Sequence, residues 1–309
     1  MKTLFYQVAS QWKADKRRYV KASSYATYVA LLNKHLLPWF GTGGCPDEAA
    51  IQAYADERLR SGLGPKTVKD SLVVLKMVLQ YGEKLGVWPR VLYRVHFPTT
   101  LPESRMPVLS QREQQKLLRH LQAHFSFRNL GLIICLHSGL RIGEVCGLQW
   151  KDLDVDEGVI HVIKTVQRLY LHDGDERLYA LRVDTPKTAS SVRDIPIARD
   201  VMRMVRPLRK VMANDFYVVS NAAAPLEPRY YRLYFRNLLQ SLDIPPVRFH
   251  ALRHSFATRC IESKCDYKTV SVILGHASLS TTMDLYVHPG LSDKKRCIER
   301  LSGALRGGR

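Results

Sequence analysis

The sequence has few of the features that mark a secreted, membrane-spanning or zinc-stabilised protein. Its six cysteines are scattered without a C-x-x-C pair, which argues for reduced thiols rather than a disulfide framework or a zinc ribbon. No apolar run approaches the length that spans a bilayer, and the N-terminal stretch lacks a secretory-type apolar core. We therefore expect a soluble, intracellular protein that does not act in a membrane.

Acidic residues are also scarce relative to basic ones. Aspartate and glutamate total 28 against 47 lysines and arginines, which gives a formal net charge of +19. A surplus of this size suits a polyanionic partner, and nucleic acid fits it better than a membrane surface. Both the first hundred residues and the remainder carry an excess of basic side chains, so two basic modules could enclose a DNA duplex from opposite sides.

The length of 309 residues fits two domains better than one. In the first hundred residues the apolar positions recur every three or four, which predicts an all-helical domain over residues 1–97. The proline-rich stretch 98–107 has no such periodicity and is the expected linker. The four helices of this first domain are expected at Leu4–Tyr19, Ser24–Trp39, Asp47–Arg60 and Pro65–Leu85.

Residues 108–309 are expected to form a second, mixed α+β domain. Ser110 and Glu113 have the spacing of a helix capping box, and a further helix is expected to end at Ser138-Gly139. Alternating and β-branched residues then predict a small antiparallel sheet, with an extra hairpin turn at His172–Asp175. Its strands are expected in Val159–Ile163, Tyr179–Val183 and Val192–Ile197. Helical patterns fill the rest, so the fold class is mainly α with a small antiparallel sheet.

Cationic side chains and one phenol gather in the C-terminal part of the sequence. His250 and Arg253 are three apart, so on a helix they project from one face and could both reach one phosphate. Gly275 is placed to end a helix in the left-handed conformation, which turns His276 out of the helical frame. Tyr286 follows on a segment that must be a short helix, because a proline soon stops it. Each of these features alone is more often structural than catalytic.

Two further cations lie earlier in the chain. Arg141 comes two residues after a helix-ending glycine, so it emerges at the start of the next helix, where Glu144 could hold it. Lys187 lies in the turn-rich segment 184–191 between two expected strands. A structural ion pair and an exposed loop lysine are the simpler explanations of these two features when each is taken by itself.

A metal site is the competing interpretation of the histidines. His250 and His254 are four apart, the spacing of two helical zinc ligands, and Cys260 and Cys265 follow. The sequence has no H-E-x-x-H motif, however, and Cys260 would lie on a different face of a continuing helix from His254. We therefore expect no metal.

In combination these motifs resemble the tyrosine recombinase (phage integrase) family, and in particular integrases of mobile elements. The motifs occur in the family's order and approximate spacing, and the resemblance covers essentially the whole chain. The segment Lys21–Tyr28 is similar to the helical core-binding domain of such integrases. The other motifs are Gly139–Glu144, Pro186–Thr188 followed by Arg193–Pro196, His250–Ser255, Leu274–His276 and Leu285–Tyr286.

The resemblance implies a catalytic set that works without a cofactor or a metal, because a covalent 3′-phosphotyrosine conserves the energy of the broken bond. Tyr286 would attack the phosphorus, Lys187 would protonate the departing 5′ oxygen, and His250 would assist proton removal. The sheet region is longer than the family's simplest form, which makes Lys164 a rival to Lys187. The whole implied set is Arg141, Lys187, His250, Arg253, His276 and Tyr286, with Glu144 in a supporting role.

The implied function is site-specific DNA recombination, by integration or excision, in the cytoplasm at the nucleoid. The implied partners are double-stranded DNA, three further copies of the chain in a tetramer on two DNA sites, and an accessory DNA-bending or excision factor. A terminal helix at Leu291–Leu305 could dock on a neighbouring subunit or on its own domain. Two alternatives remain open, a type IB topoisomerase and a non-enzymatic DNA-binding protein.

Overall fold

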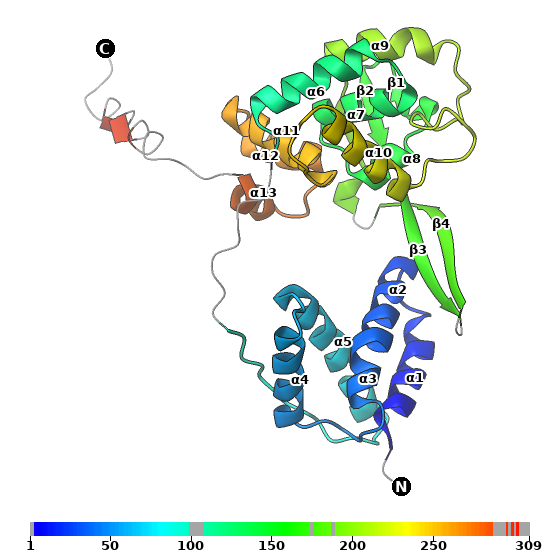
Figure 1. Ribbon diagram of the computed structural model, residues 1–309, viewed down its shortest axis with the longest axis vertical. Helices are drawn as coiled ribbons and strands as arrows, with labels where there is room; N and C mark the ends of the chain where they lie inside the picture. Colours follow the sequence, from blue (N-terminus) through cyan, green and yellow to red (C-terminus); the bar gives the residue numbers. More distant parts are fainter. Residues whose placement is uncertain are drawn as a thin grey trace. The chain divides into compact units, whose positions relative to one another are not determined.

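The computed structural model describes residues 3–98, 108–173, 176–186 and 189–286, together with 295, 298, 299, 301 and 302. For residues 170–178, 189 and 284–286 the description covers the backbone only. The chain divides into two compact units, Met1–Glu103 with Leu169–Ala180 and Ser104–Arg168 with Leu181–Arg309 (Figure 1). The predicted linker at 98–107 lies outside the described residues except for its first position, so the domain boundary stays a prediction.

The first unit contains the helices expected from the apolar periodicity. The second of them is divided, because Pro38 has no amide hydrogen to donate to the preceding turn. A widened π-helical turn, Leu32–Leu36, separates its two parts. The elements are α1 (Phe5–Lys16), α2 (Ala22–Leu31), α3 (Leu37–Phe40), α4 (Glu48–Arg60) and α5 (Pro65–Lys84).

The core of the first unit is built around α5. Its residues Leu72, Leu75 and Leu79, spaced three and four apart, are buried in one cluster with Phe5 and Trp12 of α1. Burying a leucine side chain contributes about 1.5–3 kcal/mol, so this stripe is enough to fix α5 against α1.

The second unit is also predominantly helical (Figure 1). Ser110 caps α6 as predicted: its hydroxyl accepts the Glu113 amide at 3.3 Å, and the Glu113 carboxylate accepts the Ser110 amide at 2.7 Å. Leu130, Ile133 and Ile134 of α7 are buried in the main core, which explains why this stretch is apolar on most of its faces. The helices are α6 (Gln111–Ala123), α7 (Phe127–Ser138), α8 (Ile142–Gly147), α9 (Arg199–Arg209), α10 (Pro228–Ser241), α11 (His250–Glu262), α12 (Tyr267–Leu274) and α13 (Leu279–Tyr286).

The strands form two separate sheets, which corrects the prediction of one. β1 (Leu153–Asp154), β2 (Val159–Val162) and β5 (Arg193–Pro196) make a three-stranded antiparallel sheet in the order β1-β2-β5. β3 (Thr165–Asp173) and β4 (Glu176–Asp184) make a two-stranded sheet of their own. The predicted strand at 179–183 therefore belongs to a local hairpin, because β3 and β4 are close enough in sequence to pair with each other. Of the turn predicted at His172–Asp175, residues 174 and 175 lie outside the described residues.

The register of β2 on β5 decides which side chains face the core. Ile160 pairs with Ile195 and Val162 with Arg193, and all four of these residues are buried. The intervening Asp194 points outward, where it contacts His161 at 2.8 Å. Within the described part of the chain no helix is long and apolar enough to cross a bilayer.

Candidate active site

The first site arginine stands at the beginning of α8, where the sequence places it. Gly139 ends α7 in the left-handed conformation with φ 65°, and the chain then turns into α8 with Arg141 as its N-cap. The Glu144 carboxylate accepts the Arg141 amide at 2.8 Å and the Arg141 Nη1 at 2.7 Å. The predicted pairing of Arg141 with Glu144 is confirmed, and 34% of the Arg141 side chain remains accessible to solvent.

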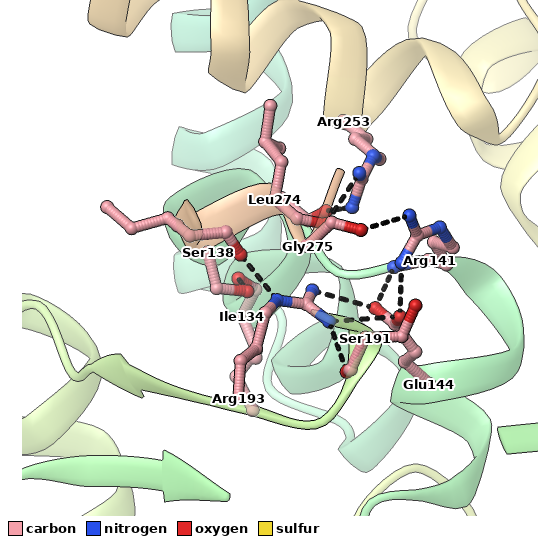
Figure 2. Close-up of polar contacts among 11 residues, drawn as sticks. Ile134, Ser138, Arg141, Glu144, Ser191, Arg193, Arg253, Leu274 and Gly275 are labelled. Atoms are coloured by element: carbon pink, nitrogen blue, oxygen red, sulfur yellow. Dashed lines mark hydrogen bonds and ion pairs between the residues drawn. The ribbon is translucent and has the colours of Figure 1, made fainter. Parts of the chain in front are cut away.

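A second arginine on the same carboxylate is a residue that sequence reasoning missed. Arg193 of β5 donates through Nη1 to Glu144 Oε1 at 3.1 Å and through Nη2 to Glu144 Oε2 at 3.0 Å. Figure 2 shows Arg141 and Arg193 converging on Glu144 from two sides. The strand pattern offered a signal, because alternation places Arg193 on the inward face with Ile195, where a buried guanidinium needs an acid.

The charges around Glu144 favour its ionised form. Burial by itself would raise the pKa of this carboxyl group, but hydrogen bonds and positive charge from Arg193 and Arg141 outweigh burial and lower the pKa below its usual value. Three guanidinium groups, those of Arg141, Arg193 and Arg253, thus lie in one region with a single carboxylate between two of them. The net charge of this group of side chains is positive, which suits a phosphate.

Arg253 lies on α11 and is buried, with 2% of its surface exposed. Its Nη1 donates to the Gly139 carbonyl at 3.0 Å, and its Nη2 donates to the Leu274 carbonyl at 2.6 Å. The nearby Arg141 Nη2 donates to the Gly275 carbonyl at 3.0 Å. Both predicted arginines therefore meet at the C-terminal end of α12 (Figure 2), although no pattern in the sequence indicated that Arg253 would be so deeply buried.

His276 follows the predicted left-handed residue. Gly275 ends α12 with φ 66°, and the His276 Nδ1 then lies 2.8 Å from the hydroxyl of Thr282, a fully buried residue of α13. Partial burial, followed by the positive charges of Arg253, Arg141 and Arg193, lowers the pKa of His276 to about 4. The ring is therefore neutral at pH 7. If Nδ1 accepts the Thr282 proton, Nε2 is the nitrogen that carries a hydrogen.

His250 begins α11, and its environment differs from that of its helix neighbour Arg253. His250 is solvent-exposed whereas Arg253 is buried, so the two residues of one helix differ in their access to solvent. Desolvation, followed by the charges of His254 and Arg253, lowers the pKa of His250 below its ordinary value. A ring that is neutral at pH 7 can accept a proton.

Two predicted catalytic side chains lie where the structure gives no side-chain description. Lys187 is outside the described residues, and Tyr286 is the last residue of α13, with its backbone described. The helix begins at Leu279, and the hydroxyl of Ser278, directly before it, accepts the Ser280 amide at 3.2 Å. The rival Lys164 contacts Asp152 at 2.9 Å, and that carboxylate is almost fully buried.

A groove of about 1000 Å³ opens beside His250. Arg229, Arg232 and Arg236 line it from α10, and Arg248 lines it from the loop before α11. All four arginines are exposed, whereas Phe235 on the other face of α10 is buried. This surface places a row of guanidinium groups next to a candidate catalytic histidine.

No metal centre accompanies these residues in the described part of the chain. Among the residues that the structure describes, no group of three or more His, Cys, Asp or Glu side chains could hold a metal ion. His254 packs its ring edge-on against the ring of His250, with centroids 4.5 Å apart, and burial lowers its pKa. The pair is thus a packed histidine contact on one helix.

Comparison with known proteins connects this geometry to a family. The profile of the phage integrase family matches residues 107–291, and that of the phage integrase N-terminal SAM-like domain matches residues 4–42. A XerC-like tyrosine recombinase of Caldanaerobacter subterraneus is 26% identical, over 82% of this chain and 70% of its own length. The ICEBs1 integrase of Bacillus subtilis is 24% identical, over 92% of this chain and 79% of its own length.

Solved structures show the same fold. The Tn1549 transposon integrase in complex with transposon right end DNA superposes with a TM-score of 0.75 at 21% identity, and covers 97% of this chain and 100% of its own. A lambda integrase tetramer bound to a Holliday junction gives a TM-score of 0.68 at 17% identity, and covers 94% of this chain and 80% of its own. These likenesses confirm the predicted fold class, a mainly helical protein with small antiparallel sheets.

Proposed function

Because the chain belongs to the phage integrase family, we propose that Tyr286 is its nucleophile. A member of this family is a site-specific tyrosine recombinase, which cleaves and rejoins DNA strands through a covalent 3′-phosphotyrosine. The observation that carries this assignment is the junction of α12 and α13. The carbonyl end of α12 holds Arg141 and Arg253, and α13, which ends at Tyr286, follows directly. One short segment thus joins the phenol to the cations that would hold the phosphate.

Arg141 and His276 are the groups best placed to stabilise charge on the non-bridging phosphate oxygens. The contacts of Arg141 with Glu144 and Gly275 engage two of its five N–H donors, and its side chain keeps solvent access. His276 would donate through Nε2, with Thr282 holding Nδ1. Donors that are fixed before the reaction stabilise the transition state most effectively, and loss of an arginine in phosphoryl transfer costs on the order of 10³-fold or more in rate.

Arg253 is proposed to hold the phosphate together with Arg141. Its guanidinium is buried, so it must gain an opening before it can contact an oxygen. Its bonds to Gly139 and Leu274 fix the position of the group. Binding of DNA would therefore uncover a cation that is already oriented.

Proton transfer is proposed to involve Lys187 and His250. Lys187 would protonate the departing 5′ oxygen, a general-acid contribution of about 10² to 10⁴. The rival Lys164 is less suited to this role, because Asp152 and Gln149 already bind its ammonium group. His250, neutral and exposed beside the arginine-lined groove, would accept the proton of the attacking phenol or orient the phosphate.

The chain binds DNA, and we propose that the groove lined by α10 is part of the surface that does so. Four arginines in this groove could contact phosphates next to the cleavage point. We further propose a homotetramer on two DNA sites, assisted by a DNA-bending or excision factor, because strand exchange needs four cleaved strands held together. With DNA as substrate, the proposed place of action is the cytoplasm, at the nucleoid.

A nicked suicide substrate tests Tyr286 directly. Such DNA loses the short strand after cleavage, so the covalent adduct accumulates and can be counted on a denaturing gel. Tyr286→Phe is expected to abolish the adduct while DNA affinity stays within about threefold, because only one hydroxyl is removed. Tyr267→Phe, which changes an exposed tyrosine on α12, is the matched control and should form adduct normally. An adduct that persists in Tyr286→Phe would refute the assignment.

Family membership does not favour a topoisomerase or a non-enzymatic DNA-binding protein. A two-site recombination assay run beside a supercoil-relaxation assay separates the three functions. Recombinant product that requires two sites is the expected result. Relaxation of plasmids lacking any site, without recombinant product, would instead indicate a topoisomerase.

A further inference from the structure

The C-terminal end of α12 binds three arginines at three successive carbonyl groups. The last carbonyls of a helix have no partner within the helix, and the helix dipole makes this end negative. Two of the three arginines, Arg141 and Arg253, belong to the proposed catalytic set, but Arg193 does not. The carbonyls are those of Ile273, Leu274 and Gly275, and their donors are, in the same order, Arg193, Arg253 and Arg141.

Arg193 is too deeply buried to touch a substrate. Only 4% of its side chain is exposed. Its Nε donates to Ile273, its Nη1 donates to the Ser191 carbonyl at 3.0 Å and to Glu144, and its Nη2 donates to the second oxygen of Glu144. A single planar guanidinium thus ties the end of α12 and the segment before β5 to the start of α8 (Figure 2).

Arg141 and Arg193 share the Glu144 carboxylate, and through it the contacts of Arg193 affect the position of Arg141. Each oxygen of Glu144 accepts one hydrogen bond from Arg141 and one from Arg193. Without Arg193, the buried carboxylate would be free to rotate and would turn its whole charge toward Arg141. Arg141 would then be drawn away from the position in which it can donate to a phosphate.

The packing around this arginine leaves little room for another arrangement. A Cβ atom on Gly275 would lie 3.1 Å from the Cδ and Nη1 atoms of Arg193 and 2.9 Å from the Ser190 carbonyl oxygen. The Arg193 side chain therefore lies directly beneath the residue that precedes His276. A shift of Arg193 would move the backbone from which His276 projects.

We propose that Arg193 is a positioning residue of the catalytic site, one that holds Glu144 and the last turn of α12 in place so that Arg141 and His276 meet the scissile phosphate in the orientation that cleavage needs. This inference rests on the proposed function. It assigns no contact between Arg193 and DNA, and it predicts that Arg193 affects the rate of cleavage rather than the affinity for the DNA site.

The test compares Arg193→Met and Arg193→Lys with the wild-type chain on the nicked suicide substrate. The rate constant for adduct formation is measured with the chain in excess over DNA and at saturation, and the dissociation constant is measured separately. Misplacing a catalytic group by about 1 Å can cost on the order of 10²-fold in rate, and we expect a loss of that size for Arg193→Met. The dissociation constant should stay within about threefold.

Arg193→Lys keeps the charge but offers one ammonium in place of a planar fork, which cannot bind the Ile273 carbonyl and both Glu144 oxygens at once. We expect about a tenfold loss in rate for this variant, intermediate between wild type and Arg193→Met. It also keeps the test decisive if Arg193→Met fails to fold, because an unchanged rate in Arg193→Lys would overturn the proposal.

Arg168→Met is the matched control for lost stability. Arg168 forms an ion pair with Glu227 at 2.6 Å and its side chain is 19% exposed, so its removal also breaks a partly buried pair in the same unit. The control should lower the melting temperature, yet leave the rate of adduct formation within about threefold of wild type when all variants are assayed well below their melting temperatures. A rate loss in the control as large as that in Arg193→Met would show that lost stability, not positioning, is responsible.

Combination with Glu144→Gln tests the route of the effect. If Arg193 acts through Glu144, the double variant should lose less than the product of the two single losses, whereas fully multiplicative losses would overturn the proposal. Failure of the wild-type chain to form an adduct would instead refute the proposed function. Normal adduct formation by both wild type and Arg193→Met would refute only the role of Arg193.

Discussion

Replacement of Glu144 by glutamine should destabilise the second unit more than any comparable surface change. Glu144 is 4% exposed, and its two oxygens accept four hydrogen bonds, two from Arg141 and two from Arg193. Whichever oxygen becomes an amide nitrogen, two N–H donors then face another donor. Removing one partner of a buried ion pair costs about 3–5 kcal/mol, and because the second oxygen survives we expect about 3 kcal/mol.

The expected shift in melting temperature follows from the size of the unit. For a domain of about 150–250 residues, 1 kcal/mol corresponds to roughly 2–4 °C, so Glu144→Gln should melt about 6–12 °C below wild type. Asp200→Asn is the control, since it breaks an ion pair with Arg203 in which both side chains are more than half exposed. That change should cost less than about 0.5 kcal/mol. Thermal and urea denaturation followed by circular dichroism measure both.

Lowering the pH should reduce the difference in the free energy of unfolding between wild type and Glu144→Gln. The folded-state pKa of Glu144 is lowered from its ordinary value of 4.5, so the ionised carboxylate stabilises the fold above that pH. This contribution is lost as the pH falls through the folded-state pKa. If Glu144→Gln lowers the free energy of unfolding at pH 7 by less than about 1 kcal/mol, or by no more than Asp200→Asn does, the argument that Glu144 holds the two arginines together is wrong.

Two further predictions concern the turn that carries His276. Gly275→Ala would force an alanine into φ 66° and place its Cβ against Arg193 and Ser190. We expect the backbone strain alone to lower the free energy of unfolding by about 1–2 kcal/mol, and we expect slower adduct formation. An unchanged melting temperature would contradict this prediction. His276 has a folded-state pKa of about 4 against an ordinary 6.5, so between these pH values the unfolded chain binds a proton that the folded chain excludes. The free energy of unfolding should therefore fall by about 1 kcal/mol, after allowance for solvent screening, as the pH drops from 6.5 towards 4. Urea midpoints measured across this window should show a shallower decline in His276→Gln, and parallel curves for variant and wild type would refute the assignment.

Local signals in the sequence were enough to predict most of the helices and several site contacts. The capping box of Ser110 and Glu113, the helix ends at Gly139 and Gly275, and the pairing of Arg141 with Glu144 all depend on residues within a few positions of one another. Such interactions are dictated by helix geometry, and the structure contains each of them. The order of the weak motifs along the chain carried the resemblance to the integrase family in the same way.

Interactions between distant segments were not predictable. The division of the strands into two sheets depended on which strands pair with each other, and β3 pairs with β4, its neighbour in the sequence. The burial of Arg253 and the contact of His276 with Thr282 depend on how α11, α12 and α13 pack. A sequence pattern shows that a side chain faces inward, but it does not identify the group that it meets there.

The sequence by itself determined the helices, their caps, the basic character of the chain and the residue types of the proposed phosphoryl-transfer site, because each of these follows from composition or from short-range geometry. Only the tertiary structure decided that Glu144 is shared between two arginines and that three arginines meet the carbonyl end of α12. The physical reason is the distance along the chain. Arg193 lies far from both Glu144 and Ile273 in sequence, and only the packing of β5 against α8 and α12 brings their polar groups within hydrogen-bonding distance.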